Sequence, residues 1–382
     1  MLSIVIPTYN EKSNVHLLME QIKTALAGIT EHEVLFVDDS DDETPQILNE
    51  LNRVYRNMSY IHRMKEKGLA SAVVCGFGMA RGDVLAVMDA DLQHPPQLLA
   101  DMYRAIEGGA DIVIPSRFIE GGGDEGLSPV RKFTSLAARL AGKMLLKSLR
   151  KVSDPTGGFF MLRREVINVE KLRPVGWKIL MEVLVMGTYT RVTEVPYSFG
   201  KRHADESKIS VKATLQYVAH IFSLIARSER ERRFYLFLLV GLNGMLIDML
   251  IYRFVSSAWL LHSNTAATIS AVCALLSNYM LNRNLTWKSS KKHSRAEVQF
   301  FRYACACSAG LLTENLVVYL LRFTTVSDVA ANFLRILASG LPIYFLSDKW
   351  VFKKKQSDKI HYEIFKPMSG MSAWRHGGST AL

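Results

Sequence analysis

The most informative stretch of the chain is Val84-Leu85-Ala86-Val87-Met88-Asp89-Ala90-Asp91-Leu92-Gln93-His94-Pro95-Pro96. Its apolar first part predicts a buried strand, and two carboxylates separated by one residue project to the same side of an extended chain. Burying both charges is costly unless a cation lies between or beside them. A hard divalent ion that also contacts substrate phosphates meets that need. A helix cap before Pro95 would explain Asp91, but it leaves Asp89 without a role.

Four further β-branched runs surround this strand in the first part of the chain. The predicted strands are Leu2–Ile6, Glu33–Val37, Ser59–His62, Val84–Met88 and Ile112–Pro115, with helices between them at about 13–28, 44–56, 68–81 and 96–108. Strands that alternate with helices predict an α/β fold with a parallel, Rossmann-like sheet. Because ligands of such sheets bind beyond the carboxyl ends of the strands, the polar residues there form the candidate site.

Two other strand ends carry polar residues that suit nucleotide binding. The first strand runs into Pro7-Thr8-Tyr9-Asn10-Glu11, and the second ends in Asp38-Asp39-Ser40-Asp41-Asp42-Glu43-Thr44. So many carboxylates repel one another unless cations or hydrogen-bond donors lie among them. We expect Asp39 to accept hydrogen bonds from a nucleoside base or ribose. Other carboxylates of the run, such as Asp41 and Asp42, are expected to cap the next helix.

The chain of 382 residues divides into two unlike parts. Charges are spread through residues 1–230, as in a soluble domain, whereas residues 234–352 hold long apolar runs. The formal net charge of +11 arises from 47 Lys and Arg against 36 Asp and Glu, and the excess gathers near the apolar runs. That placement favours an anionic membrane surface over nucleic acid, for which no motif is present. The four cysteines lack metal-ligand spacing, so neither zinc nor disulfides are expected.

Four apolar segments in the second part approach the length that crosses a bilayer. They are roughly 234–256, 264–282, 300–322 and 329–348. The charged residues Asp248, Glu314 and Arg335 fall inside them and are expected to face other helices or water. Lys and Arg cluster before the first segment, between the second and third, and after the fourth. The positive-inside rule therefore predicts that both termini lie in the cytosol, and the absence of a signal-peptide pattern agrees with a cytosolic first domain.

Three further features complete the predicted organisation. Residues at about 128–150 and 208–230 are expected to form helices at the membrane interface, since the first combines an apolar face with basic residues. The two helix pairs of the membrane part resemble each other at an interval of about 65 residues, which indicates a duplicated hairpin. Residues 354–382 are polar and without periodicity, and we expect them to be disordered.

The ordered motifs of residues 1–210 resemble those of family 2 glycosyltransferases with the GT-A fold. The resemblance is greatest to polyprenyl-phosphate sugar synthases of the dolichol-phosphate mannose synthase type. Beyond the strand ends already quoted, the matching motifs are Ser116-Arg117, Asp154-Pro155-Thr156-Gly157-Gly158-Phe159-Phe160, Gly176-Trp177-Lys178-Ile179-Leu180-Met181-Glu182, Phe199-Gly200-Lys201-Arg202 and Glu206-Ser207-Lys208. Residues 231–353 resemble GtrA-like domains with four transmembrane helices. Residues 1–230 are then the cytosolic catalytic domain.

The resemblance implies a role for each matching residue. The residues implied to bind the nucleotide sugar are Pro7, Tyr9, Glu11, Val37, Asp39, Met88, Asp89, Ala90, Asp91, Gln93, Arg117, Lys178, Arg202 and Lys208. Those implied at a divalent metal, Mg²⁺ or Mn²⁺, are Asp89, Asp91 and Gln93. Those implied at the acceptor phosphate are Arg117, Arg131, Ser135 and Arg202. The implied catalytic set is Asp89, Asp91, Arg117, Arg131 and Arg202.

The resemblance further implies transfer of a hexose, expected to be mannose from GDP-mannose, to dolichyl or another polyprenyl phosphate. Since a phosphate monoester is largely ionised at neutral pH, its oxygen needs no dedicated base to attack the sugar. A single displacement inverts the anomeric centre. The product is then expected on the cytosolic face of a plasma membrane.

Three alternatives remain open at this point. In the first, the enzyme transfers a sugar from UDP-glucose or another UDP-sugar to a polyprenyl phosphate, and the product serves surface glycan modification. A processive polysaccharide synthase is disfavoured because the Gln-x-x-Arg-Trp motif is absent. A lipid-sugar flippase or transporter with a degenerate nucleotide-binding domain is disfavoured by the intact Asp89, Asp91 and Arg202.

Overall fold

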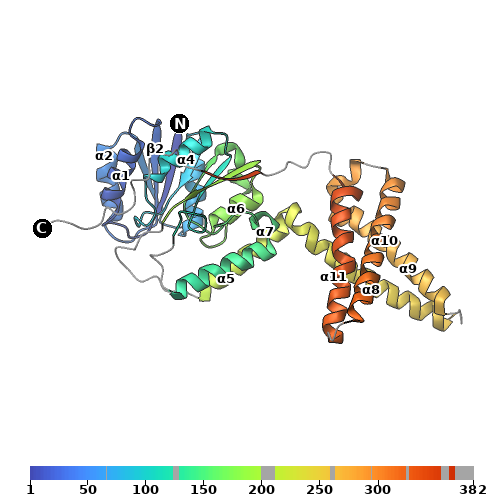
Figure 1. Cartoon of the computed structure of the whole chain (residues 1–382). Coiled ribbons are helices and arrows are strands. Elements are labelled where there is room, and N and C mark those ends of the chain that lie inside the picture. The colour runs from blue at the N-terminus through green and yellow to red at the C-terminus, as the bar shows by residue number, and fades with distance from the viewer. Residues whose placement is uncertain are drawn as a thin grey trace. The chain divides into compact units, whose positions relative to one another are not determined.

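The computed structural model of the chain describes residues 1–65, 67–123, 129–198, 211–258, 263–293, 295–323, 327–353 and 361–365. The chain divides into two compact units (Figure 1). The first comprises Met1–Ser228 together with Asp358–Leu382, and the second comprises Glu229–Ser357. The C-terminal segment thus returns to the first unit after the chain has built the second.

An eight-stranded sheet forms the centre of the first unit, with the strand order β3-β2-β1-β4-β6-β5-β7-β8. The strands are β1 Leu2–Thr8, β2 His32–Asp38, β3 Met58–His62, β4 Val84–Val87, β5 Ile112–Ser116, β6 Phe160–Arg163, β7 Arg191–Pro196 and β8 His361–Ile364. The α/β fold and the five predicted strands are confirmed. A wholly parallel sheet is wrong, because β6 runs antiparallel to β4 and β5. It begins beside the carboxyl end of β4, where Phe160 pairs with Val87, and so has to run back along the sheet.

Four helices cover the two faces of this sheet at the predicted positions: α1 Val15–Leu26, α2 Thr44–Val54, α3 Leu69–Met79 and α4 Leu98–Glu107. Buried residues of α1, α2 and α4 form one core cluster with the alternate β1 residues Leu2, Ile4 and Ile6. On the other side of β1, α3 lies against Val5. A Cβ atom at Gly76 of α3 would lie 2.3 Å from the Val5 side chain, so only glycine permits this close contact.

Helices α5 Pro129–Leu145, α6 Ile179–Met186 and α7 Val211–Arg227 complete the first unit, with short 3-10 turns at Lys147–Leu149, Arg164–Val166 and Val169–Lys171. The Tyr217 hydroxyl of α7 donates to the Ala138 carbonyl of α5 at 2.6 Å, and the two helices lie side by side (Figure 1). Both expose large apolar side chains, which are Phe133, Leu136, Leu140 and Met144 on α5 and Leu215, Val218 and Phe222 on α7. The predicted interface helices therefore exist, and their contact with a bilayer stays a prediction.

The C-terminal segment contradicts one prediction. Residues 361–364 form β8, which pairs in parallel with β7 at the edge of the sheet. The expectation of a disordered tail over residues 354–382 is wrong for this strand. This short segment of alternating polar and apolar residues forms a strand because the edge of β7 provides backbone groups for it to pair with. The neighbouring residues 354–360 and 366–382 lie outside the described part of the chain.

Helices build the second unit, with one at each of the four predicted positions. They are α8 Glu229–Ala258, α9 Ser263–Leu281, α10 Ala296–Leu321 and α11 Asp328–Leu346. A π-helical turn follows α9 at Asn282–Thr286 and another follows α11 at Ser347–Val351, and a 3-10 turn lies at Lys288–His293. Among the described residues, Glu229–Ser257 and Ala296–Leu321 are long and apolar enough to cross a membrane. Crossing by α9 and α11 stays a prediction.

The aromatic core of the second unit shows the predicted repeat of the two helix pairs. Trp287 and Phe352 each follow a π-helical turn, and their rings stack with centroids 4.8 Å apart. Tyr279, before the first turn, packs on Phe352 at 6.4 Å. Tyr344, before the second turn, packs on Trp287 at 6.1 Å. Equivalent residues of the two pairs thus make reciprocal contacts, as a two-fold arrangement requires.

The charges inside the helices also occur at equivalent positions of the repeat. Asp248 accepts a hydrogen bond from the Ser270 hydroxyl at 2.6 Å. Glu314 accepts one from the Arg335 guanidinium at 3.0 Å. Each acidic residue is therefore paired with the facing helix of its own hairpin, which is how membrane proteins accommodate such groups.

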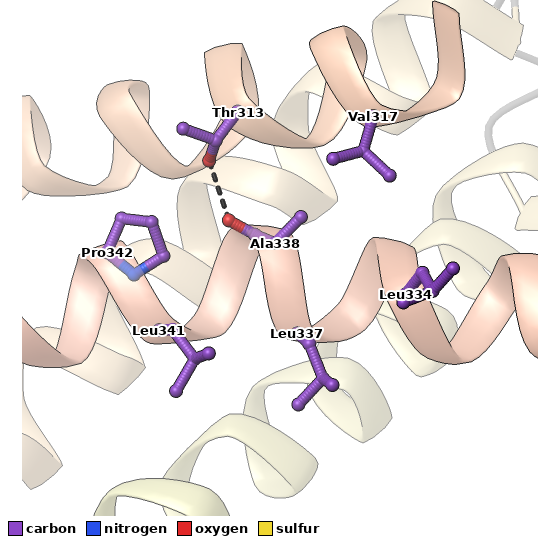
Figure 2. A pocket seen from close by; sticks show the side chains of 7 residues that line it. All are labelled: Thr313, Val317, Leu334, Leu337, Ala338, Leu341 and Pro342. Carbon is purple, nitrogen blue, oxygen red and sulfur yellow. Dashed lines mark hydrogen bonds between the residues drawn. The ribbon is translucent and has the colours of Figure 1, made fainter. Parts of the chain in front are cut away.

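An apolar groove of about 430 Å³ lies between α10 and α11 (Figure 2). Pro342 lies inside α11 and has no N–H to offer the carbonyl of Ala338, four residues earlier. The Thr313 hydroxyl of α10 donates to this carbonyl at 2.6 Å instead. A side chain of one helix therefore satisfies the backbone group that the proline of the other leaves without its helical donor.

This arrangement yields a stability prediction for the second unit. Thr313→Val removes the hydroxyl, and we expect it to lower the free energy of unfolding by about 1 kcal/mol. Thr313→Ser should retain full stability, because it keeps the donor. Combining Thr313→Val with Pro342→Ala should recover the loss, because an alanine in place of the proline provides an N–H to the same carbonyl. Thermal unfolding in detergent measures all three, and equal stability of the Val and Ser variants would contradict the interpretation.

Candidate active site

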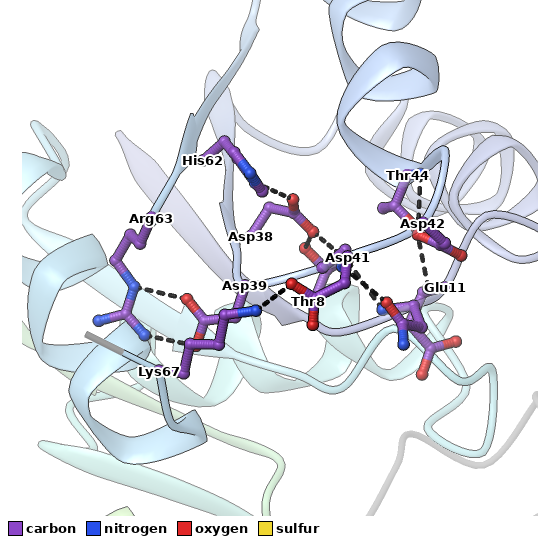
Figure 3. A network of polar contacts seen from close by, with 12 residues as sticks. Thr8, Glu11, Asp38, Asp39, Asp41, Asp42, Thr44, His62, Arg63 and Lys67 are labelled. Carbon is purple, nitrogen blue, oxygen red and sulfur yellow. Dashed lines mark hydrogen bonds and ion pairs between the residues drawn. The ribbon is translucent and has the colours of Figure 1, made fainter. Parts of the chain in front are cut away.

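A network of charged side chains lies at the carboxyl ends of β1, β2 and β3 (Figure 3). Asp38, the last residue of β2, is fully buried and accepts a hydrogen bond from the Thr8 hydroxyl at 2.8 Å. The Nδ1 atom of His62, at the end of β3, lies 2.7 Å from the other Asp38 oxygen. Asp38 is therefore held by its neighbours on both sides of β2.

Asp39 makes a two-pronged ion pair with Arg63, which follows β3. The Arg63 Nε and Nη2 atoms donate to the two Asp39 oxygens at 2.8 and 2.6 Å. The Gly68 N–H, at the start of α3, donates to Asp39 at 2.8 Å. A carboxylate accepts about four hydrogen bonds, so these three leave acceptor capacity for a ligand. Arg63 supplies the cation that the acidic run requires, and sequence reasoning did not single it out.

The predicted nucleoside residues lie around this network. Pro7 of β1 pairs with Val37 of β2 in the sheet. The Glu11 N–H donates to the Thr44 hydroxyl at 3.1 Å, which joins the β1 loop to the start of α2. The Tyr9 ring is 57% exposed, and the Nζ of Lys67, which is ion-paired with Asp41, lies 5.8 Å from its centre. An exposed aromatic ring beside a held carboxylate is suited to stacking on a base.

The capping interpretation of the acidic run is correct for Asp42. Its carboxylate accepts the Thr44 N–H at 2.9 Å, which satisfies one of the unpaired donors at the start of α2. Asp41 instead faces Lys67. The run thus divides into one helix-capping carboxylate, a second carboxylate, Glu43, which pairs with Lys12 after β1, and others that pair with groups from the β3 side.

The strand before Asp89 is one residue shorter than predicted. Because β4 ends at Val87, the loop that carries Asp89, Asp91 and Gln93 begins at Met88. Leu92 adopts a left-handed conformation with φ of 60°, and the Gln93 N–H donates to the Asp91 carboxylate at 3.1 Å. The Asp89 N–H donates to the His94 Nδ1 at 3.2 Å. The buried His94 ring packs on Phe159, with centroids 5.2 Å apart. The loop is therefore held by its own backbone and by a histidine that sequence reasoning passed over.

Asp89 lies against the backbone of Gly158, just before β6. A Cβ atom at Gly158 would lie 2.9 Å from the Asp89 Oδ2. The missing side chain leaves room for the Asp89 carboxylate. In the part of the chain described, no three His, Cys, Asp or Glu side chains converge on one point. Because Mg²⁺ is usually held by one or two carboxylates together with substrate phosphates, the oxygen donors of Asp89, Asp91 and Gln93 fit such an ion.

A further ion pair lies after β5. The Arg117 Nε donates to the buried Asp154 at 2.8 Å, and Arg117 itself is partly buried. Lys178, before α6, donates to the Thr156 carbonyl at 2.7 Å. Burial lowers the pKa of Lys178 to about 8, although the charge of Asp154 opposes this effect. Asp89 also acts on Lys178, so residues far apart in sequence meet in one electrostatic environment.

Tyr197 lies within the electrostatic influence of both acidic residues of the β4 loop. It follows β7 and is buried, and burial raises the pKa of its hydroxyl. The charges of Arg117, Asp154, Asp89 and Asp91 all act on this hydroxyl. The charges of the loop and of the Arg117–Asp154 pair therefore act on one shared group.

The predicted acceptor residues are only partly within the described structure. Ser135 lies half-buried on α5, whereas the side chain of Arg131 and all of Arg202 and Lys208 lie outside the described residues. One turn after Ser135, Arg139 stacks on the Phe118 ring at 3.7 Å and donates to the Ser153 carbonyl at 3.4 Å. Arg139 was not among the residues that the sequence predicted for the site.

Known proteins resemble the chain in both units. Residues 3–169 match the family described as Glycosyl transferase family 2, and residues 236–352 match the GtrA/DPMS transmembrane domain. The chain is 38% identical to a dolichol-phosphate mannosyltransferase of Pyrococcus furiosus over 338 residues, which cover 88% of this chain and 95% of that one. It is 33% identical to the Saccharomyces cerevisiae enzyme of the same name over 234 residues, 58% of this chain and 86% of the other.

Part of the chain also resembles solved structures. The crystal structure of glucosyl-3-phosphoglycerate synthase from Mycobacterium tuberculosis, in complex with Mn²⁺, uridine diphosphate and glucosyl-3-phosphoglycerate, aligns with a TM-score of 0.44 at 17% identity. The alignment covers 59% of this chain and 79% of that one.

Proposed function

Because the chain belongs to the family 2 glycosyltransferases with a GtrA/DPMS transmembrane domain, we propose that it transfers mannose from GDP-mannose to dolichyl or another polyprenyl phosphate. It is a glycosyltransferase of the dolichol-phosphate mannosyltransferase type. The observation that carries the proposed reaction is the 38% identity to such an enzyme across 88% of the chain, membrane part included.

The donor nucleoside is proposed to bind at the carboxyl ends of β1 and β2. Asp39 is held by Arg63 and retains acceptor capacity for a base or ribose hydroxyl. Tyr9 offers an exposed ring for stacking. The donor diphosphate then extends toward Lys178, which we propose to bind it directly, and toward Asp89, Asp91 and Gln93, which would bind it through a divalent ion. Arg202 and Lys208 are proposed as further phosphate contacts on the strength of the family motif.

Positioning and charge are proposed to drive the transfer. Arg117 is fixed by Asp154, and we propose that its planar guanidinium contacts the acceptor phosphate, with Arg131, Ser135 and Arg202 as further partners. Mg²⁺ or Mn²⁺ bound at Asp89 and Asp91 would supply charge neutralisation to the departing diphosphate. The acceptor oxygen is already ionised and attacks the anomeric carbon in line. One displacement gives inversion, so an α-linked donor yields a β-linked lipid product.

The membrane orientation is also a proposal. Basic residues flank the predicted spans on the side of both termini, which by the positive-inside rule places the catalytic unit in the cytosol. We propose a plasma membrane location with the product formed on the cytosolic face.

The donor assignment is tested with the purified full-length protein in detergent. Radiolabelled GDP-mannose and UDP-glucose are offered in parallel with dolichyl phosphate and with a polyprenyl phosphate. Transfer of mannose, with a β-linkage by NMR of the product, supports the proposal. Transfer of glucose alone would overturn the donor, and an α-linked product would overturn single displacement.

The pKa of Lys178 predicts how the reaction depends on pH. Lys178 loses its charge near pH 8 rather than 10.5, so we expect kcat/KM for the donor to fall as the pH rises above about 8. Lys178→Arg, which stays charged, should remove this decline. Between about pH 8 and 10.5, Lys178 binds a proton in the unfolded chain but not in the folded chain. This group therefore makes the protein more stable as the pH rises. Thermal unfolding measured beside the rates therefore separates loss of charge from loss of fold, and an unchanged pH profile in the Arg variant would contradict the assignment.

A further inference from the structure

The last described strand, β8, lies outside both segments that match known families. Those segments are residues 3–169 and 236–352, whereas β8 spans His361–Ile364. It nevertheless belongs to the catalytic unit, because it pairs with β7 over Arg191–Glu194. The Phe365 N–H extends the ladder by donating to the Glu194 carbonyl at 2.9 Å.

Side chains strengthen the attachment of β8 to the unit. The Arg191 guanidinium donates to Glu363 at 2.6 Å through Nη2. Phe365, directly after the strand, packs against the main hydrophobic cluster of the sheet. Backbone pairing, an ion pair and an apolar anchor together indicate a built edge strand rather than a loose end.

Two routes connect β8 with the loop that carries Asp154. In the first, Glu194 of β7 accepts hydrogen bonds from the Ser153 N–H at 2.9 Å and from its hydroxyl at 2.6 Å. In the second, the Lys151 ammonium lies 5.2 Å from the centre of the Tyr362 ring of β8. The strand therefore touches this loop directly and also through the β7 residue that its own ladder holds.

The same loop positions the cations of the candidate active site. Asp154 binds the Arg117 guanidinium at 2.8 Å, and the Thr156 carbonyl accepts from Lys178 at 2.7 Å. We propose that β8 is a positioning strand of the catalytic unit, which holds Lys151 and Ser153, and through the neighbouring Asp154 keeps the Arg117 guanidinium facing the acceptor phosphate. A shift of the order of 1 Å in such groups costs about a hundredfold in rate.

The position of β8 predicts an uneven effect on the two substrates. It forms one edge of the sheet, whereas β3, which holds the nucleoside network, forms the other. Loss of β8 should therefore act on the acceptor side and leave the nucleoside contacts in place. A general loss of folding would instead impair both substrates together.

The test compares a chain that ends at Ser357 with one that ends at Pro367. The shorter chain keeps the whole second unit and lacks β8, whereas the longer chain keeps β8. We expect kcat/KM for dolichyl phosphate to fall about tenfold or more in the shorter chain, with KM for the donor nearly unchanged, and the longer chain to match the full protein. A peptide of residues 358–367 should restore the shorter chain by adding a strand to the β7 edge. The same peptide with Tyr362→Ala and Phe365→Ser should not.

A second variant covers the case in which the shorter chain fails to fold. The full-length protein with Tyr362→Ala and Phe365→Ser should show the same acceptor-side loss, and His361→Ala, at an exposed position of β8, serves as its matched control. Equal kcat/KM for the acceptor in the double variant and the control would overturn the inference.

The activity readout rests on the proposed function, so hydrogen exchange of residues 151–157 provides a separate one. Faster exchange there without β8, and slower exchange again with the peptide, supports the positioning role. If the full-length protein transfers no mannose, the proposed function is wrong. The hydrogen-exchange rates of residues 151–157 still test whether β8 positions this loop. Equal exchange with and without the strand would overturn its positioning role even in an active enzyme.

Discussion

Asp91→Ala is expected to lower kcat for sugar transfer by about a hundred- to a thousandfold. Asp91 lies on the loop after β4, where its carboxylate accepts a hydrogen bond from the Gln93 N–H, and both it and Asp89 act electrostatically on Tyr197. Removing it takes away one of the two charges that suit a divalent ion at the donor diphosphate. Binding of Mn²⁺, measured by electron paramagnetic resonance, should weaken in the same variant.

A matched control is Asp101→Ala on α4, where the carboxylate forms a partly exposed ion pair with Arg104. It removes the same charge from the same unit and should leave both kcat and Mn²⁺ binding unchanged. Exhaustive chelation of the wild-type protein should reproduce the Asp91→Ala defect, with recovery on adding Mg²⁺ or Mn²⁺. Wild-type turnover by Asp91→Ala, or turnover that survives chelation, would refute a metal-dependent site at this loop.

Gly158→Ala is expected to reduce kcat by about a hundredfold while leaving the fold intact. The new methyl group would lie 2.9 Å from the Asp89 Oδ2, and the carboxylate is the far end of a side chain that is able to rotate away. The protein therefore relieves the contact cheaply, but it does so by moving a proposed metal ligand. Thermal unfolding should change little, whereas turnover should fall.

Gly157→Ala provides the matched control, because it adds the same methyl group one residue earlier. At Gly157 the nearest atom, the Asp154 carbonyl oxygen, would be 3.8 Å away, an ordinary contact. We expect this variant to retain wild-type turnover. If the two alanine variants had the same activity, the close approach of Asp89 to Gly158 would have no catalytic importance.

Several features of the fold follow from patterns within short segments. The five strands of the predicted sheet, the helices between them and the four helices of the second unit occur where the hydrophobic periodicity indicates. Such patterns are local because a strand or helix exposes its apolar residues at a fixed spacing. The acidic pair of Asp89 and Asp91 was also recognisable locally. Two carboxylates at the end of an apolar strand are costly to bury without a cation, so their presence there indicates a binding site.

Other features were not accessible in this way. Phe160–Arg163 is too short to show its direction, and it runs antiparallel because the chain arrives at the carboxyl end of β4. His361–Ile364 becomes a strand because β7 has an edge for it to pair with. In both cases the partner lies far away in the sequence, and no local spacing encodes it.

For the candidate site, too, some features are local to the sequence and others depend on the fold. The chemical types are legible in the amino-acid sequence: carboxylates at two strand ends, basic residues after them, and an apolar second part for the membrane. Which of these groups meet depends on the folded chain, which brings Arg63 to Asp39, Arg117 to Asp154, and Gly158 to Asp89. Side-chain chemistry belongs to each residue alone, whereas ion pairs and close contacts depend on where distant strands end in space.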